Sequence, residues 1–197
     1  PSEKMKKELV SFGTKKPIEV VPNFVYSEKF VTSERNFLHD MCNIPKTSPI
    51  LLSVGRMGRE KNFPFLLKAF KKVIETDSTS HLVMIGDGEE IDSIKSYADS
   101  LKLGTRVHFT GKIQQSDIAK AYADSDIFVF SSKTEVHPMV VLEAASAGLP
   151  FVVVKDYCYK NAIIDGQNGY QVPQNLNDFA IKVIYLLQNK QKRLAFG

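Results

Sequence analysis

Residues 127–154 read IFVFSSKTEVHPMVVLEAASAGLPFVVV, and this stretch decides the fold. Its two ends, Ile127–Phe130 and Phe151–Val154, are short runs of aliphatic and aromatic residues with the length of buried strands. The segment Met139–Ala147 between them has a helical pattern, and Gly148-Leu149-Pro150 after it stops a helix. A strand, a helix and a second apolar strand in this order predict a βαβ unit with parallel strands.

The same alternation of apolar runs and helical patterns continues along the chain. The other predicted strands are Ile50–Val54, His81–Ile85 and Arg106–Phe109, and the other helices of this core are Phe63–Glu75, Glu90–Leu101 and Ser116–Ala123. Near-continuous apolar strands separated by helices indicate a parallel sheet that is covered on both faces. We therefore predict an α/β fold, a Rossmann-like parallel sheet with helices on both faces, in a single domain over residues 1–197.

Within this domain we expect a core at residues 50–173, preceded by residues 1–49 and followed by C-terminal helices at residues 174–197. The predicted parts outside the βα alternation are a helix at Glu3–Phe12, a short strand at Ile18–Val21, a polar connector at Ser27–Pro49, a turn-rich segment at Asp156–Pro173 that ends in a short strand, and a helix at Leu176–Gln188. The first residue is Pro1 rather than Met, and we expect the chain to be a piece of a larger protein.

Composition limits the function classes. With 43% hydrophobic and 24% charged residues, the chain resembles an ordinary globular domain, and no run approaches the roughly 20 apolar residues that span a bilayer. Cys42 and Cys158 have no metal-ligand spacing, so we expect a cytoplasmic protein. The net charge of +4 is compatible with phosphorylated ligands or an anionic membrane surface, whereas nucleic acid would need a denser basic patch.

Two glutamates lie on either side of the predicted helix start in the opening stretch. Glu135 is in the loop, and Glu143 is about one turn into the helix. A helix N-terminus binds phosphate or another anion, and because Pro138 has no backbone N–H, Met139 and Val140 are the expected donors. Carboxylates accept strong hydrogen bonds from hydroxyl groups, so the pair indicates sugar hydroxyls rather than a metal. An acidic loop residue followed by a solvent-facing helical glutamate is the alternative.

Three further loops follow predicted strands and should share a rim with the glutamate loop. The first contains Gly55, Arg56 and Lys61, which offer close backbone approach and two cations for phosphate; a solvated basic turn is the alternative. The second begins with Gly86, which either lets a ligand lie against the strand end or makes a tight turn. The third is Thr110-Gly111-Lys112-Ile113, which alone indicates a turn.

Together these motifs resemble the nucleotide-sugar-binding C-terminal domain of family-four retaining glycosyltransferases with the GT-B fold. The resemblance rests on Pro22-Asn23, Gly55-Arg56 with Lys61, Gly86-Asp87-Gly88, Thr110-Gly111, Glu135 with Glu143, Gly148-Leu149-Pro150, and Asp165-Gly166 with Asn168-Gly169. The ordered series covers nearly the whole chain. It implies a hexosyltransferase whose substrate is a nucleotide sugar, most simply a UDP-sugar.

The resemblance also implies residue roles. Arg56 and Lys61 would bind the donor diphosphate and, with Glu135, form the catalytic set. The backbone around Met139 and Val140 would assist at the diphosphate. Glu143 would bind the ribose hydroxyls, Glu135 the transferred sugar, and the backbone of Lys112 and Ile113 the base; these residues, with Gly55 and Gly86, form the expected binding site. No metal and no cofactor are expected, because the cations and the helix terminus neutralise the leaving diphosphate.

Two departures from the family pattern flank the sugar. Val136-His137-Pro138 stands where relatives often have Gly-Phe-Gly, and Lys155-Asp156-Tyr157 replaces a Gly-Gly step. His137 is either a general base or a surface or packing residue. Pro1–Met5 and Asp156–Tyr170 are similar to bacterial diacylglycerol glucosyltransferases, which make membrane glycolipids. That similarity implies peripheral association of the full protein with the inner face of a membrane, with a polysaccharide, glycoprotein or small-molecule acceptor as alternatives.

In GT-B enzymes the acceptor binds mainly to an N-terminal domain that this sequence lacks, so we expect the chain alone to be inactive. A nucleotide-sugar epimerase or a sugar phosphorylase of the same architecture remains an alternative, as does a non-catalytic nucleotide-binding module. A domain that binds NAD is the least favoured alternative, because no Gly-x-Gly-x-x-Gly opens the first helix.

Overall fold

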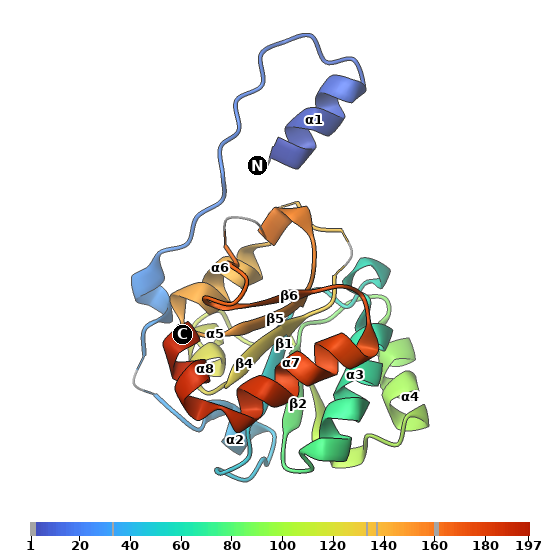
Figure 1. Cartoon of the computed structure of the whole chain (residues 1–197), viewed down its shortest axis with the longest axis vertical. Helices are drawn as coiled ribbons and strands as arrows, with labels where there is room; N and C mark the ends of the chain where they lie inside the picture. The colour runs from blue at the N-terminus through green and yellow to red at the C-terminus, as the bar shows by residue number, and fades with distance from the viewer. Residues whose placement is uncertain (1–2, 33, 133, 137, 160–161) are drawn as a thin grey trace.

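The computed structural model describes all residues except 1–2, 33, 133, 137 and 160–161. His137 therefore lies outside the described residues, as does Asn161 in the segment predicted to be rich in turns. The core is one six-stranded sheet with the strand order β3-β2-β1-β4-β5-β6 (Figure 1). The strands are β1 (Ile50–Val54), β2 (His81–Ile85), β3 (Val107–Gly111), β4 (Ile127–Phe130), β5 (Phe151–Val154) and β6 (Gly169–Val172). All neighbouring strands pair in parallel, which confirms the predicted Rossmann-like sheet.

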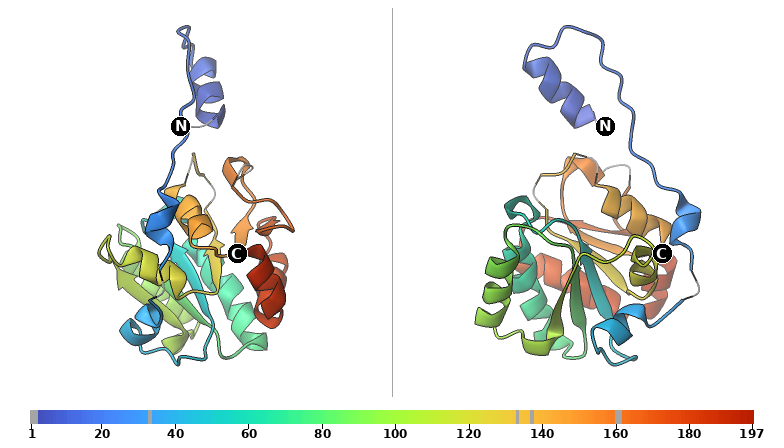
Figure 2. Two further views of the ribbon diagram at one scale, coloured as in Figure 1. Left: turned by 90° about the vertical axis from the view of Figure 1, so that its left-hand side faces the viewer. Right: turned by 180° about the vertical axis from the view of Figure 1, so that it is seen from behind.

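Helices cover both faces of the sheet, as the left view of Figure 2 shows. One face packs against α3 (Phe63–Thr76), α4 (Ile91–Ser100), α7 (Leu176–Gln188) and α8 (Lys190–Phe196). The other face packs against η1 (Ser27–Phe30), α2 (Phe37–Met41), α5 (Ile118–Ala123) and α6 (Met139–Ser146). Strand side chains alternate between the two layers: Leu51 contributes to the first core, and Leu52 to the second. Burial on both faces explains why these strands are continuously apolar.

The predicted core elements are confirmed within one or two residues at their ends. The short strand predicted at Ile18–Val21 is wrong, because the structure has no strand at these residues. The run is rich in β-branched residues, but it lies away from the sheet, and Val21 is 69% exposed. A strand is stabilised by packing against cross-strand neighbours, and this run has no strand beside it. The helix α1 (Glu3–Ser11) before it also stands apart from the sheet (Figure 1).

The connector predicted at Ser27–Pro49 contains η1 and α2 and is attached to the core through one carboxylate. Asp124, at the end of α5, accepts hydrogen bonds from the backbone N–H groups of Asn36, Leu38 and His39 at 2.7, 2.8 and 3.1 Å. It also lies 2.9 Å from His39 Nδ1, and both side chains are buried. The carboxylate thus satisfies N–H groups at the start of α2 that have no partner within the helix.

No helix in the described part of the chain is long and apolar enough to cross a bilayer.

Candidate functional site

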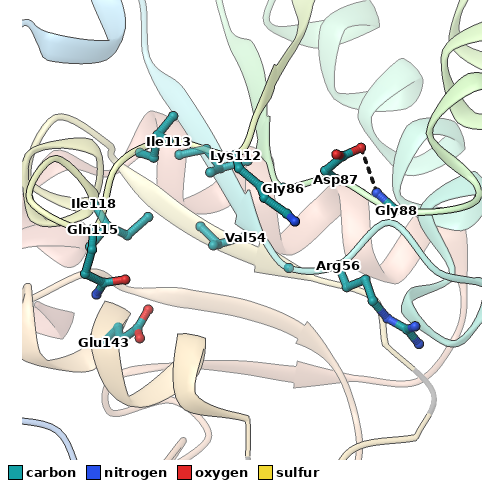
Figure 3. A pocket seen from close by; sticks show the side chains of 12 residues that line it. Val54, Arg56, Gly86, Asp87, Gly88, Lys112, Ile113, Gln115, Ile118 and Glu143 are labelled. Atoms are coloured by element: carbon teal, nitrogen blue, oxygen red, sulfur yellow. Dashed lines mark hydrogen bonds between the residues drawn. The ribbon is translucent and has the colours of Figure 1, made fainter.

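The loops after β1, β2 and β3 meet at the carboxyl edge of the sheet and enclose a pocket of about 610 Å³ (Figure 3). Its lining residues are Val54, Gly55, Arg56, Ile85, Gly86, Asp87, Gly88, Lys112, Ile113, Gln115, Ile118 and Glu143. The first nine come from the strand ends and the loops that follow them, and Glu143 comes from α6. This is the place where open parallel sheets bind ligands.

Backbone hydrogen bonds between the loops fix the floor of the pocket. Gly55 N–H donates to the Ile85 carbonyl at 3.0 Å, and Gly86 N–H donates to the Gly111 carbonyl at 2.9 Å. The loops approach so closely that a Cβ at Gly86 would lie 1.9 Å from the Gly55 carbonyl oxygen, and Gly86 has φ +137°. Both facts require glycine at this position.

We expect Gly86→Ala to lower the free energy of unfolding by about 3 kcal/mol, because backbone strain and overpacking act together. Urea denaturation of the chain would measure the loss. The matched control is Gly104→Ala, which also has a positive φ, +53°, but where no residue other than the two chain neighbours comes within 4 Å of the position that a Cβ would take. It should cost only about 1 kcal/mol, from backbone strain alone. Equal losses in the two variants would contradict a role for the close approach.

Arg56 lies at the opposite end of the pocket from Glu143 (Figure 3). Its side chain is 62% exposed and forms ion pairs with Glu60 at 3.1 Å and Glu89 at 3.7 Å. The hydrogen bond to Glu60, followed by the charge of Glu89, raises the pKa of the guanidinium. Both pairs are exposed and therefore weak, so the guanidinium can turn toward an anion at little cost.

Lys61 and Glu135 form a buried ion pair beside the pocket. Lys61 Nζ lies 2.5 Å from Glu135 Oε1, and the two side chains are 15% and 10% exposed. The ammonium also lies 5.4 Å from the centre of the Phe130 ring. Lys61 Cε comes within 3.8 Å of the position of a Cβ on Gly55, so the pair adjoins the pocket wall without forming part of the lining.

Two buried serines hold the loop that carries Lys61. Ser131 Oγ donates to the Lys61 carbonyl at 2.8 Å, and Ser132 Oγ donates to the Glu60 carbonyl at 3.1 Å. Both serines follow β4 directly and are at most 1% exposed. Sequence reasoning missed them; the signal was a pair of small polar residues between a buried strand and the glutamate loop.

Glu143 is held in place by a buried tyrosine. Tyr122 Oη donates a hydrogen bond to Glu143 Oε2 at 2.8 Å. Burial, and then the charge of Glu143, raises the pKa of the Tyr122 hydroxyl well above its usual value, so the hydroxyl stays a donor. Tyr122 was not predicted from the sequence, because a tyrosine in an apolar helical pattern looks like an ordinary core residue.

The predicted backbone donors lie where the sequence placed them, at the first turn of α6. Pro138 precedes the helix, which begins at Met139. First-turn N–H groups have no partner within a helix and are available to a ligand. The side chains of Met139 and Val140 do not line the pocket.

The structure thus brings six predicted residues into one pocket: Gly55, Arg56, Gly86, Lys112, Ile113 and Glu143. Lys61 and Glu135 pair with each other next to it, and Met139 and Val140 begin α6. Sequence reasoning did not assign the remaining lining residues, which are Val54, Ile85, Asp87, Gly88, Gln115 and Ile118. Asp87 and Gly88 share a motif with Gly86, whereas Gln115 and Ile118 gave no local signal.

Among the residues that the structure describes, no group of three or more His, Cys, Asp or Glu side chains could hold a metal ion. The expectation of a metal-free site stays a prediction.

The parallel sheet, the pocket at its carboxyl edge and the carboxylate on α6 together define the C-terminal-type half of a GT-B glycosyltransferase. The chain belongs to the family Glycosyl transferases group 1, whose model matches residues 34–197.

Two curated relatives are alpha-monoglucosyldiacylglycerol synthases. The protein from Acholeplasma laidlawii is 23% identical over 97% of this chain, and the one from Streptococcus pneumoniae is 30% identical over 86%. The chain spans 49% and 40% of the lengths of these relatives, which is about half or less.

Solved structures share the fold. The glycosyltransferase WaaG, involved in lipopolysaccharide biosynthesis, superposes with a TM-score of 0.87 at 19% identity, covering 99% of this chain and 54% of WaaG. Anabaena HepE in complex with UDP and glucose gives a TM-score of 0.86 at 18% identity, with 99% and 54% coverage.

Proposed function

We propose that this chain is the donor-binding part of a retaining hexosyltransferase, and that its pocket binds a UDP-sugar. One observation carries the proposal: a single pocket has a carboxylate fixed at one end, at Glu143, and the guanidinium of Arg56 at the other, while the ammonium of Lys61 lies just outside its wall. A nucleoside diphosphate has the complementary arrangement, with ribose hydroxyls at one end and negative charge at the other.

The base, ribose, diphosphate and sugar of the donor would each contact a different part of the pocket and its surroundings. Ile113 and Glu143 both lie at the end of the pocket away from Arg56, and the Lys112 side chain points toward Gly86 (Figure 3), so the base would bind at the loop after β3 and the ribose at Glu143. The diphosphate would lie between Gly55 and the start of α6, within reach of Arg56 and Lys61. The sugar would then extend toward Glu135, which lies beyond Lys61.

The chemistry needs charge neutralisation where the bond to the leaving group breaks. As the bond from the sugar to the diphosphate breaks, negative charge grows on the diphosphate oxygens. Arg56, Lys61 and the N–H groups of Met139 and Val140 would stabilise this charge, which makes a metal unnecessary. Glu135 would accept hydrogen bonds from sugar hydroxyls and orient the reacting carbon.

The names of the relatives support a lipid acceptor for the whole protein. Because two relatives are glucosyldiacylglycerol synthases, we propose a glycolipid product. The acceptor would be held largely by a further N-terminal domain, at the cytoplasmic face of a membrane. Incubating the full-length protein with UDP-glucose and no acceptor separates a transferase from an epimerase, because only an epimerase would convert the sugar.

Isothermal titration of the chain with UDP, GDP and their glucose conjugates would test donor binding. We expect UDP and UDP-glucose to bind more tightly than their GDP counterparts. The absence of any binding tighter than about 1 mM, in a chain shown to be folded, would contradict the proposal.

The ribose contact gives a sharper prediction. Glu143→Gln should weaken UDP binding about tenfold or more, because a hydrogen bond to a charged group contributes about 1.5–3 kcal/mol. Tyr122→Phe should weaken it by a smaller factor, since the variant removes only the bond that orients Glu143. Titration calorimetry measures both effects.

Glu75→Gln is the control for lost charge, because Glu75 is exposed on α3 and lies outside the pocket lining. It should leave the affinity unchanged. If Glu143→Gln bound UDP as well as this control, the ribose assignment would be wrong.

A further inference from the structure

A second hollow, of about 500 Å³, lies at the other end of the strands. It is lined by Cys42, Asn43, Pro45, His81, Thr105, Arg106 and His108. His81 is the first residue of β2 and His108 the second of β3, so the hollow is at the amino edge of the sheet, away from the donor pocket. In Figure 1 this is the lower edge, where α2 lies.

The histidines in this hollow form an ordered relay of hydrogen bonds. Arg106 Nη1 lies 3.2 Å from His81 Nε2, and a guanidinium can only donate, so Nε2 accepts. The His81 proton is therefore on Nδ1, which lies 2.9 Å from His108 Nε2 and donates to it. The proton of His108 is in turn on Nδ1, and no acceptor for it is found in the described part of the chain. The relay occupies an acceptor nitrogen in each ring.

The hollow carries positive charge without a counter-charge. None of the described residues that line it is acidic, and Arg106 pairs with no carboxylate within the described part of the chain. Burial, then the charges of His108 and Arg106, lower the pKa of His81 to about 4, and burial lowers the pKa of His108. Both rings are thus neutral near pH 7, and the relay keeps its order.

We propose that this hollow binds a small oxyanion of the phosphate class, either free phosphate or a phosphate monoester. The guanidinium of Arg106 matches two phosphate oxygens, and the N–H of His108 and the hydroxyl of Thr105 add neutral donors. A metal cation does not fit, because the relay occupies the imidazole lone pairs and Arg106 repels a cation. The volume leaves room for a small organic group attached to the phosphate.

The proposal is independent of the donor site, since the two pockets share no residue. Titration of the chain with inorganic phosphate, followed by heteronuclear NMR, should shift the backbone signals of Thr105 and Arg106. Glycerol phosphate is the second probe: tighter binding than phosphate supports an ester as the ligand, and equal affinity supports free phosphate.

Arg106→Gln should weaken phosphate binding at least about tenfold, because it removes a charge-assisted hydrogen bond. His108→Phe should also weaken phosphate binding, while keeping an aromatic ring beside His81. This variant replaces Arg106→Gln in the test if Arg106→Gln does not fold. The control Lys95→Gln removes an exposed charge from α4, outside the hollow, and should change nothing. Arg56→Gln is the control for phosphate that binds in the donor pocket instead, and it should leave binding in the hollow unchanged.

Cys42 provides a second measurement, because it lines the hollow and burial raises the pKa of its thiol. Bound phosphate should slow alkylation of Cys42, detected by peptide mass spectrometry, and leave the rate at Cys158 unchanged. The proposal is overturned if phosphate shifts no signal in the hollow, or if a folded Arg106→Gln or His108→Phe chain binds phosphate like the unmodified one. It is also overturned if Arg56→Gln alone abolishes the binding.

Discussion

Lys61→Met is expected to lower the free energy of unfolding by about 3 kcal/mol, because it leaves the buried Glu135 carboxylate without its cation. The two side chains are 15% and 10% exposed, so water compensates little for the lost partner. Methionine replaces the apolar stem of lysine as far as Cε, which limits the change in packing around Phe130. Urea denaturation of the two chains measures the difference.

The double variant Lys61→Met/Glu135→Gln separates the loss of charge pairing from damage to packing. Replacing both partners of a buried pair by neutral groups is often close to neutral for stability. The double variant should therefore recover most of the stability that Lys61→Met loses. Both variants lack the Lys61 cation, so both should bind UDP more weakly than the unmodified chain. Recovery of both stability and UDP affinity in the double variant would mean that Lys61 does not bind the diphosphate.

The exposed pair of Lys46 and Asp40 provides a matched control, with side chains 49% and 74% exposed. Lys46→Gln should cost less than about 1 kcal/mol, as exposed ion pairs usually do. If Lys61→Met cost no more than Lys46→Gln, burial would not strengthen the Lys61–Glu135 pair.

The core strands could be predicted because their signal is local. A parallel strand that is buried on both faces has to be apolar at nearly every position, as Ile50–Val54 is, and the next helix follows within a short loop. The wrong strand at Ile18–Val21 shows the limit of the same signal. Its composition resembles that of a true strand, but only the fold decides whether a neighbouring strand lies beside it.

The site could be predicted only in part, because several of its contacts join distant residues. The loops after parallel strands share an edge, which was enough to bring Gly55, Gly86 and Lys112 together. Tyr122 and Glu143 interact across two helices, and nothing local in the sequence marks that hydrogen bond. The sequence indicated ligand-binding roles for Lys61 and Glu135 separately, but they are 74 residues apart, and only the structure shows their mutual ion pair.

That ion pair has a consequence for donor binding under the proposed function. Without a donor, the cation for the diphosphate and the carboxylate for the sugar neutralise each other. A diphosphate that attracts Lys61 has to weaken the Lys61–Glu135 bond, so UDP alone binds against this competition. A UDP-sugar compensates the loss, because its hydroxyl groups donate hydrogen bonds to the released carboxylate. The pair would thus favour the intact donor over the spent nucleotide.

Glu135→Gln is therefore expected to tighten UDP binding by the chain about tenfold, which corresponds to about 1.4 kcal/mol of relieved competition. The variant leaves the ammonium of Lys61, whose side chain is 15% exposed, without its carboxylate, and a bound diphosphate would replace that partner. In the full-length protein the same variant should lower the rate of sugar transfer at least about a hundredfold, because a neutral amide binds the reacting sugar less strongly than a carboxylate. Calorimetry and a transfer assay measure the two effects.

Glu89→Gln is the matched control, because Glu89 also pairs with a cation of the proposed diphosphate site, Arg56, but at 3.7 Å and with both side chains exposed. This pair competes weakly with a ligand, so UDP affinity and transfer should change by less than about twofold. An opposite result for Glu135→Gln, with weaker UDP binding, would show that Glu135 assists the diphosphate instead of competing for Lys61. If Glu135→Gln bound UDP more tightly but transferred sugar at the normal rate, Glu135 would compete for Lys61 but would not bind the transferred sugar.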